Sequence, residues 1–502
     1  MPLWNEIFNQ SVNLPSSQDP VSMPVSIDIP KGTRRLRFKC LHQQKPFNTD
    51  KTWLNQCIDH YADHPAVTPD QKETIYNILQ DSIPVVANIS HSVIFLDSNN
   101  NFCARWDASF TEWQELDLNN ASQRYYVGEI NPGVWTAIIH STSPTNNNAS
   151  MTIIIETTEE TDPNSVPADI YPIEQMLVNE VNLAWYIGEL HEHTSQSQGS
   201  LSPEQTIDTY KNVGYNFLAL SDHDTPPLRT LESESPITLI RGQEIQWSFG
   251  HALLLGVHDW FTPCAPEPIE HITDFVHSVH SKGGLLCAVH PHGLHPGDAR
   301  SSWHVKNMDW SSVDLLEIWS GSWNKRFPEI LKSFDLWDTL LNAGHRVYGV
   351  CGKGSTQPTE TEILEKCPKS LVLSEGASET QLLSALKQGH FYSTCEPAIS
   401  MRLDSEHGGA FIGDELRIPV DSVFAIHVDI TKLERTFMRI KTNWGVYCEM
   451  PLSSIRESSL KFYEHATADI QWFRVEIYRY GRPLDQLLAF TNPVFVRGML
   501  SI

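Results

Sequence analysis

The sequence is poor in positive charge. Its 502 residues include 36 lysines and arginines against 61 aspartates and glutamates, which gives a formal net charge of −25 at pH 7 with histidine neutral. A surface of that sign repels phosphate backbones, so we expect no nucleic-acid partner. The composition favours a soluble acidic protein, and it leaves assembly into a homo-oligomer open.

Paired cysteines and long apolar runs are also missing. The nine cysteines are scattered without a CxxC pair, a distribution typical of reduced thiols rather than of a disulfide framework. No segment approaches the roughly 20 apolar residues that a membrane span requires. The first twenty residues lack the basic start and apolar core of a secretory signal. We therefore expect a cytoplasmic protein that does not bind membranes.

The chain is long enough for two or three domains, and its pattern changes twice. Residues 1–180 carry short alternating strands separated by Asn, Ser, Pro and Gly clusters, which predict an N-terminal β-sandwich-like domain with one helical interruption over 51–81. Residues 183–400 alternate apolar strands with amphipathic helices, which predicts a parallel sheet, open or closed into a barrel. Residues 401–502 return to strands and predict a smaller C-terminal β-rich domain.

One helix of the middle region has clear ends. In SPEQTIDTYKNVG, Ser202 is placed to cap the helix, Pro203 to occupy its first position and Gly214 to end it. The apolar run FLAL follows and ends in polar residues. In parallel α/β folds, such strand ends are where the chemistry is found.

Histidines crowd into this middle region. Eleven of the 22 lie between His191 and His295, and several stand at the ends of predicted strands. Histidine is the commonest metal ligand. His191 and His193 project to the same face of a strand, because side chains repeat every two residues, and both can reach one ion. Taken alone, each is equally well explained as a packed or exposed histidine.

Other candidates stand at similar positions, and each has an ordinary alternative. Asp222, His223 and Asp224 either form a polar site or a turn that caps a helix. Glu244 and Glu317 end apolar runs as ligands or as carboxylates at a strand exit. The same choice applies to two more histidines, His251 and His290.

In this order the motifs resemble a known family. The series HEHTSQSQG, LSDHDT, IRGQEI, GHALLLG, CAVHP and LLEIWSG is similar to the polymerase and histidinol phosphatase (PHP) superfamily of metallohydrolases. The resemblance is greater to its CehA/McbA-like branch of carbamate-ester hydrolases, which NPGVW, ALKQGHFYSTCEP and NPVFV also match. The matching motifs extend over nearly the whole chain.

The resemblance implies an α/β fold: a distorted (β/α)7 barrel flanked by an N-terminal β-sandwich and a C-terminal β-rich domain. It also implies divalent ions (Zn, Mn or Fe) at the strand ends. His191, His193 and Glu244 match the family's first site. The second site shares Glu244 and adds His251 and His290.

The ligands of the family's third site are largely missing. Gln198 stands where the family's third site has Asp, and Thr356 stands where it has His. Gly354 replaces the Asp of the same late motif, so the resemblance implies that the first site has also lost its fourth ligand. Of the third-site ligands only His223 is present, so we expect one or two ions rather than three. Three nearby polar residues either compensate as donors or form an ordinary polar loop: His292, His295 and Asp298.

The expected chemistry is hydrolysis of an ester, carbamate or phosphoester bond by hydroxide generated at the cation. We expect Asp222 or Asp224 to orient a ligand imidazole and His223 to protonate the leaving group of a small-molecule substrate. Lys353 is a candidate to replace some of the missing cationic charge on the substrate side, unless it points to solvent. Trp319 and His292 are further candidates for substrate contact, although core packing explains the tryptophan equally well.

The reduced ligand set leaves alternatives. A site with fewer ions in an acidic protein favours neutral esters over phosphate monoesters, although phosphoesterase activity is the commoner chemistry of the family. The same losses are also typical of a catalytically inactive relative that binds a ligand or partner through the old cleft. Metal content and an ester panel distinguish these interpretations.

Overall fold

The computed structural model describes most of the chain. The described residues are 2–14, 21–43, 72–73, 90–107, 112–117, 130–142, 149–160, 183–227, 237–247, 250–261, 272–293, 303, 309–354, 358–365, 368–431, 434–452, 457–481 and 485–499. The helix predicted over 51–81 lies outside these ranges, apart from residues 72 and 73, and so do His295, Asp298 and Thr356.

The first strands form two four-stranded antiparallel sheets. One has the order β1 (Asn5–Leu14), β8 (Ala149–Thr158), β3 (Arg35–Gln43), β6 (Gln114–Asp117). The other has the order β2 (Val21–Ile29), β7 (Gly133–Thr142), β4 (Ser90–Leu96), β5 (Phe102–Asp107). Alternate side chains of both sheets share one apolar core, in which the rings of Phe38 and Phe95 lie 4.4 Å apart. The pair is therefore a β-sandwich.

A 15-stranded sheet runs through the rest of the chain. Its first part is β9 (Ala184–Glu192), β10 (Phe217–Leu220), β11 (Thr238–Trp247), β12 (Gly250–Leu255), β13 (Leu285–Val289), β14 (Leu315–Ser320) and β15 (Tyr348–Gly352). Neighbours are parallel except at β12, which is antiparallel to both of its neighbours. The helices between these strands are α3 (Pro203–Asn212), α4 (Ile272–Ser281), η3 (Trp310–Ser312) and α5 (Trp323–Asn342).

Helix α3 begins and ends as the sequence predicts. The Ser202 side chain accepts a hydrogen bond from the Gln205 backbone, and the Gln205 side chain accepts one from the Ser202 backbone, a reciprocal capping box. Pro203 is the first helical residue, and Gly214, at φ +88°, follows the last turn. The predicted cap, first residue and end are confirmed.

The described strands form a strand-rich α/β fold, but their pairing does not establish the expected closed barrel. In the described part of the chain, no hydrogen-bonded ladder joins β15 to β9. The two strands nevertheless approach each other, since the Gly354 amide donates to the His191 carbonyl at 2.9 Å. Gly352 permits this approach, because a Cβ there would lie 2.5 Å from the Cβ of His191.

The sheet continues without interruption into the C-terminal strands. From β9 it passes through β16 (Lys369–Ser374), β17 (Phe391–Thr394), β26 (Gln486–Thr491), β25 (Gln471–Arg479), β22 (Thr436–Thr442) and β23 (Gly445–Pro451). Helices α6 (Glu360–Glu365) and α7 (Glu379–Lys387) lie before and after β16, and β20 (Glu415–Pro419) pairs with β27 (Val494–Met499) at the side of this path. A separate sheet contains β19 (Gly408–Phe411), β18 (Ile399–Ser405), β21 (Val423–Thr431) and β24 (Glu457–His465).

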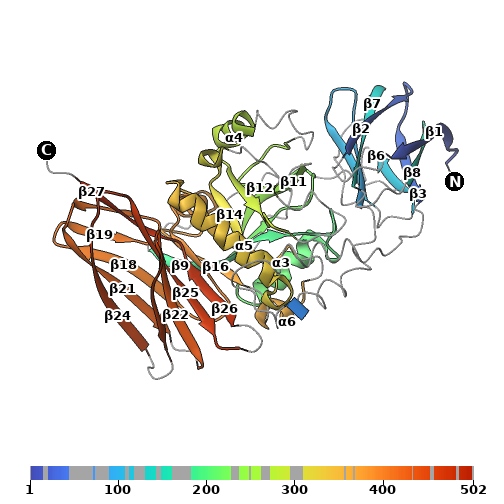
Figure 1. Cartoon of the computed structure of the whole chain (residues 1–502). Helices are drawn as coiled ribbons and strands as arrows, with labels where there is room; N and C mark the ends of the chain where they lie inside the picture. The colour runs from blue at the N-terminus through green and yellow to red at the C-terminus, as the bar shows by residue number, and fades with distance from the viewer. Residues whose placement is uncertain are drawn as a thin grey trace.

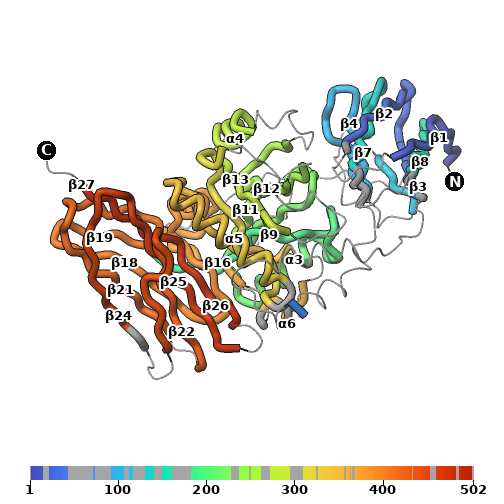
Figure 2. Tube along the Cα trace, in the orientation of Figure 1, coloured from blue at the N-terminus to red at the C-terminus, as the bar shows by residue number. Residues whose placement is uncertain are grey.

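The NPVFV motif, near the end of the chain, is hydrogen-bonded to β15. The side chain of Asn492 accepts a hydrogen bond from the Gly349 amide at 2.7 Å and donates to the Phe391 carbonyl at 3.1 Å. Strands β9 to β13, which carry or adjoin the candidate histidines, lie between the N-terminal sandwich and the C-terminal sheets, as Figures 1 and 2 show. No helix among the described residues is long and apolar enough to cross a membrane.

Candidate metal centre

Five imidazoles surround one buried carboxylate at the ends of neighbouring strands. The carboxylate belongs to Glu244 in β11, which is 0% exposed. The histidines stand at or beside the ends of β9, β10, β12 and β13, and each is at most 9% exposed: His191, His193, His223, His251 and His290. Residues far apart in the sequence therefore meet at one point.

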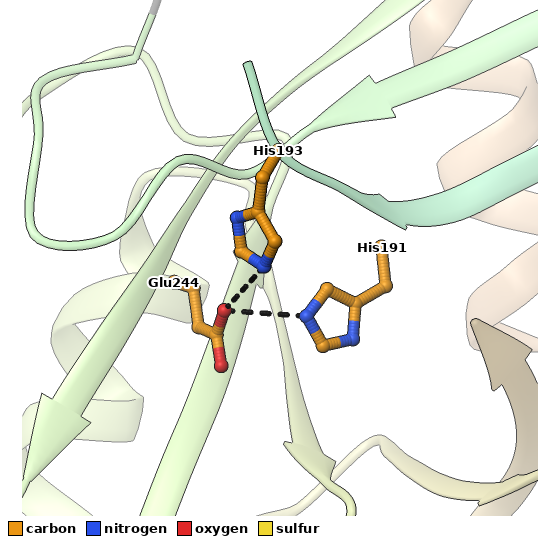
Figure 3. A group of neighbouring side chains, drawn as sticks. All are labelled: His191, His193 and Glu244. Atoms are coloured by element: carbon orange, nitrogen blue, oxygen red, sulfur yellow. Dashed lines mark hydrogen bonds and ion pairs between the residues drawn. The ribbon is translucent and has the colours of Figure 1, made fainter. Parts of the chain in front are cut away.

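Three of these imidazoles face one oxygen of the carboxylate. Oε2 of Glu244 lies 3.2 Å from Nε2 of His191 and 3.2 Å from Nε2 of His193, as Figure 3 shows. Nδ1 of His223 lies at the same distance, 3.2 Å, from this oxygen. The alternation along β9 sends the first two rings to the same side of the strand, as the sequence predicts.

The other two imidazoles face the second oxygen. Oε1 of Glu244 lies 3.0 Å from Nδ1 of His251 and 3.5 Å from Nε2 of His290. The five rings follow one another around the carboxylate with centroid separations of 5.2, 4.5, 5.7, 5.1 and 5.8 Å, in the order His191, His193, His223, His251, His290 and back to His191. We call these five imidazoles and Glu244 the histidine ring.

Backbone pairing places His223 beside Glu244. The two residues form a parallel β-bridge beyond the end of β10. The Glu244 amide donates to the Asp222 carbonyl at 3.2 Å, and the Asp224 amide donates to the Glu244 carbonyl at 2.8 Å. The strand ends thus fix the imidazole against the carboxylate.

The donor set fits a divalent metal better than a hydrogen-bond network. A carboxylate offers about four lone-pair sites, fewer than the five ring nitrogens that face Glu244. Nδ1 of His223 is buried 3.2 Å from Oε2, yet makes no hydrogen bond among the described residues. Two groups have ligand atoms within 4.8 Å of one another and could hold an ion: His191, His193 and Glu244; and His223, Glu244 and His251. Imidazole and carboxylate ligands suit zinc, manganese or iron.

The charges of the ring suit cation binding. Burial alone would raise the pKa of Glu244, but the imidazoles of His223 and His191 hold that pKa well below its ordinary value. Burial lowers the pKa of His223 well below the ordinary value, and the neighbouring histidines lower it further. The Glu244 carboxylate is therefore ionised and the His223 imidazole neutral, which are the states that bind a metal. Burial would lower the pKa of His191, but Glu317 and Glu244 raise it well above its ordinary value, so a metal that binds at this ring displaces a proton.

Glu317, in the middle of β14, orients two members of the ring. Its Oε1 accepts a hydrogen bond from Nδ1 of His191 at 2.9 Å, and its Oε2 accepts one from the backbone amide of His290 at 2.9 Å. The first bond leaves Nε2 of His191 facing Glu244, the arrangement by which carboxylates fix metal-binding histidines. The sequence left Glu317 open as ligand or strand-exit carboxylate, and the structure gives it this orienting position.

Asp222 contacts a loop instead of an imidazole. Its carboxylate accepts hydrogen bonds from the Thr194 amide at 2.8 Å, the Thr194 hydroxyl at 2.6 Å and the Ser197 hydroxyl at 2.6 Å. Asp222 was expected to orient a ligand imidazole. The structure shows instead that its carboxylate holds the turn that follows His193. His223, expected to be free for proton transfer, lies in the histidine ring among the candidate ligands.

Lys353 points neither to solvent nor to the ring. Its side chain is 1% exposed, and its Nζ donates to the Tyr210 hydroxyl at 3.0 Å and lies 3.9 Å from Oε2 of Glu189. The Tyr210 hydroxyl donates in turn to Glu192, whose pKa burial raises to about 8. The solvent-facing interpretation of Lys353 is therefore wrong, because Tyr210 and Glu189 hold its ammonium group inside the protein. This network was missed, although the two glutamates in YIGELHE on a buried strand were a visible signal.

The remaining predicted residues lie around the ring in different settings. Trp319 is 0% exposed within the apolar core, and its ring is 6.3 Å from that of Trp323, so it is a packing residue here. His292 is half-buried in the turn after His290. Gln198 is exposed, whereas Gly354 lies against the ring: a Cβ there would be 3.5 Å from Nε2 of His191.

Comparisons with known proteins give distant structural matches. No model of a known protein family matches the chain. No curated protein matches its sequence. A solved two-domain protein containing a predicted PHP-like metal-dependent phosphoesterase from Bacteroides vulgatus is 12% identical, with a TM-score of 0.35, over 65% of this chain and 100% of its own. An amidohydrolase from Chromobacterium violaceum is 15% identical, with a TM-score of 0.22, over 34% of this chain and 88% of its own. At these scores, the resemblance assigns neither fold nor activity.

Proposed function

We propose that the protein is a metal-dependent hydrolase of the PHP superfamily, in its CehA/McbA-like branch, that cleaves an ester, carbamate or phosphoester bond. The observation that carries this proposal is the histidine ring: five buried imidazoles that converge on the single carboxylate of Glu244. The order of the motifs along the sequence supports the choice of family. The acidic composition supports a small-molecule substrate rather than nucleic acid.

The ring would hold one or two divalent ions. His191, His193 and Glu244 form one group of ligands, and His223 and His251 form a second group that shares Glu244. A bound divalent cation supplies activation of water near neutral pH and electrostatic stabilisation of the developing oxyanion. No disulfide joins the described cysteines, which supports the cytoplasmic location that we include in the proposal.

The surrounding residues keep the ring in place. Glu317 holds Nδ1 of His191 and so presents Nε2 to the ion. Asp222 holds the turn at Thr194 and Ser197, which directly follows His193 in the chain. These holding residues are buried, so water does not compete for their hydrogen bonds: Glu317, Asp222, Thr194 and Ser197.

The test combines metal analysis with a substrate panel. We expect purified protein to contain one or two equivalents of zinc, manganese or iron. It should hydrolyse at least one member of a panel of 4-nitrophenyl esters, 1-naphthyl carbamate and 4-nitrophenyl phosphate. The variant His193→Ala should lose metal and turnover together. The control His390→Ala removes a histidine that pairs with Asp414 outside the ring, and it should keep both. Turnover that survives His193→Ala undiminished would contradict the proposal.

A second candidate is a catalytically inactive relative that binds a ligand at the same place. The observation that favours it is the loss of donors at positions 198 and 354, of which Gly354 lies directly against His191. Wild-type protein that binds a ligand but hydrolyses no member of the panel, with metal or without, would favour this candidate over the hydrolase.

A further inference from the structure

Lys353 is a buried cation. It follows β15 in the chain, and its side chain is 1% exposed. Its Nζ lies 4.5 Å from the centroid of the Tyr210 ring and 5.2 Å from that of the Tyr215 ring, and it donates to the Tyr210 hydroxyl at 3.0 Å. Lysine is almost never fully buried unless a compensating charge accompanies it. The ammonium group therefore needs an anionic partner inside the protein.

Glu189, in β9, supplies that partner. Its Oε2 lies 3.9 Å from Nζ of Lys353, and its side chain is 1% exposed. Its Oε1 accepts hydrogen bonds from three backbone amides, those of Leu190 at 3.1 Å, His191 at 3.0 Å and Lys353 at 3.1 Å. One carboxylate oxygen thus holds the backbone of two chain segments, and the other faces the ammonium group.

The backbone of His191 is held from two sides by this arrangement. Its amide donates to the Glu189 carboxylate. Its carbonyl accepts a hydrogen bond at 2.9 Å from the amide of Gly354, the residue after Lys353. In the described part of the chain no hydrogen-bonded ladder joins β9 to β15, so the contacts of residues 353 and 354 take its place. The position of His191 therefore depends on the stretch that carries Lys353.

A shift of His191 would affect one group of ligands more than the other. Its Nε2 lies 3.2 Å from Oε2 of Glu244, and ligands must be held within about 0.5 Å of their productive geometry. His223 is fixed separately, by its own β-bridge to Glu244. His251 is fixed by the pairing of β12 with β11. The group of ligands that contains His191 is thus the one that depends on Lys353.

We propose that Lys353 is a positioning residue of the metal centre: its ammonium group compensates the buried Glu189 carboxylate, which fixes the backbone of His191 for metal binding. This inference rests on the metal centre of the proposed function and deepens it. The sequence suggested Lys353 as a positive charge on the substrate side, whereas its contacts place that charge behind a ligand. Two carboxylates then orient one histidine, Glu317 at its imidazole and Glu189 at its backbone.

The test measures zinc affinity by chelator competition at pH 7.5 in wild type, Lys353→Met, Glu189→Gln and the double variant. Methionine is an unbranched side chain without the charge, and glutamine keeps an oxygen that accepts the backbone amides. We expect each single variant to bind one zinc equivalent about 10–100-fold more weakly than wild type. The double variant should recover most of this loss, because removing a buried ion pair entirely costs less than leaving one of its charges alone.

The recovery distinguishes charge compensation from a simple packing contact. If Lys353 only filled space, the second substitution would add to the loss. Unchanged or tighter zinc binding in Lys353→Met would overturn the inference, and so would a double variant that binds zinc no better than Lys353→Met. If Lys353→Met does not fold, Glu189→Gln is compared with the double variant, and equal zinc affinities then overturn the inference.

Lys441→Met is the matched control. Lys441, in β22, pairs with Asp338 at 3.0 Å outside the histidine ring. The variant removes the same charge from another ion pair, and it should keep the zinc affinity of wild type. An equal loss of zinc affinity in Lys441→Met and Lys353→Met would show a general effect of charge and overturn the assignment.

Zinc binding needs no turnover, so this inference and the proposed function can fail separately. Protein that shows the loss and the recovery but hydrolyses no ester supports the inference and contradicts the hydrolase. Protein that hydrolyses an ester while Lys353→Met keeps the zinc affinity of wild type has the opposite meaning. Wild type that binds no zinc overturns the inference.

Discussion

Glu317→Gln tests whether the carboxylate behind His191 serves the metal centre. The wild-type carboxylate accepts two hydrogen bonds, from Nδ1 of His191 and from the backbone amide of His290, both at 2.9 Å. A glutamine of the same shape has one accepting oxygen, and its amide nitrogen would face the second donor. One of the two buried donors is therefore left without a partner.

The size of the effect follows from this geometry. A hydrogen bond to a charged group contributes about 1.5–3 kcal/mol, and a buried donor left unsatisfied costs about 1–3 kcal/mol. We expect Glu317→Gln to lower the free energy of unfolding of the metal-free protein by about 2.5–6 kcal/mol by both effects together. Since His191 also loses the partner that fixes its tautomer, metal affinity should fall about 10–100-fold.

Two measurements distinguish the structural from the metal-directed effect. Denaturant unfolding gives the stability, and competition with a fluorescent zinc chelator at pH 7.5 gives the affinity. Glu476→Gln is the control: Glu476 is a buried acceptor for Arg474 and Tyr478, in β25. It should lose stability but keep its metal affinity. If Glu317→Gln loses stability and keeps full metal affinity, the orienting role assigned to Glu317 is refuted.

Three further predictions follow from single sites. Gly352→Ala should prevent metal binding or folding, because its Cβ would lie 2.3 Å from Oε1 of Glu317 and 2.5 Å from Cβ of His191; metal content of the purified variant checks this. Glu192 has a folded-state pKa of about 8 against an ordinary 4.5, so its contribution to stability is present below pH 4.5 and lost as pH rises through 8. Glu192→Gln should therefore lose less stability than wild type between pH 6 and pH 9 in denaturant unfolding, and an identical pH dependence would contradict the assignment. The pKa of Glu244 lies well below 4.5, so metal-free wild type should lose stability as pH falls below 4.5, and Glu244→Gln should lose less.

The convergence of the ring residues could be anticipated from the sequence, because they recur at strand ends in a fixed order. The HxH alternation brings His191 and His193 to one side of β9, and the carboxyl ends of neighbouring strands place His223 and Glu244 together. The sequence does not predict the hydrogen-bond partner of the second ring nitrogen or carboxylate oxygen of each residue, because tertiary contacts determine it. Glu317 illustrates this, because its two donors come from β9 and from beyond β13.

The errors have a common physical cause. Lys353 in a glycine-rich stretch has the sequence pattern of an exposed loop, yet glutamates of β9 and a tyrosine of α3 surround it with compensating groups. Trp319 stands two residues after Glu317, and regular alternation would place both on one face of β14. A register shift between them in the β14–β15 pairing breaks the alternation, and Trp319 lies in the apolar core.

Charge counting at the ring distinguishes one bound ion from two. The imidazoles are neutral when they bind metal, so the protein supplies two negative charges at the centre, from Glu244 and Glu317. One divalent ion cancels these charges and leaves the centre neutral, whereas two ions leave it doubly positive. With two ions the centre therefore attracts an anionic substrate in a chain of net charge −25, whereas with one ion it does not. The KM for 4-nitrophenyl phosphate should consequently be lower in protein loaded with two equivalents of metal than with one, and a KM that is independent of metal loading would contradict this count of charges.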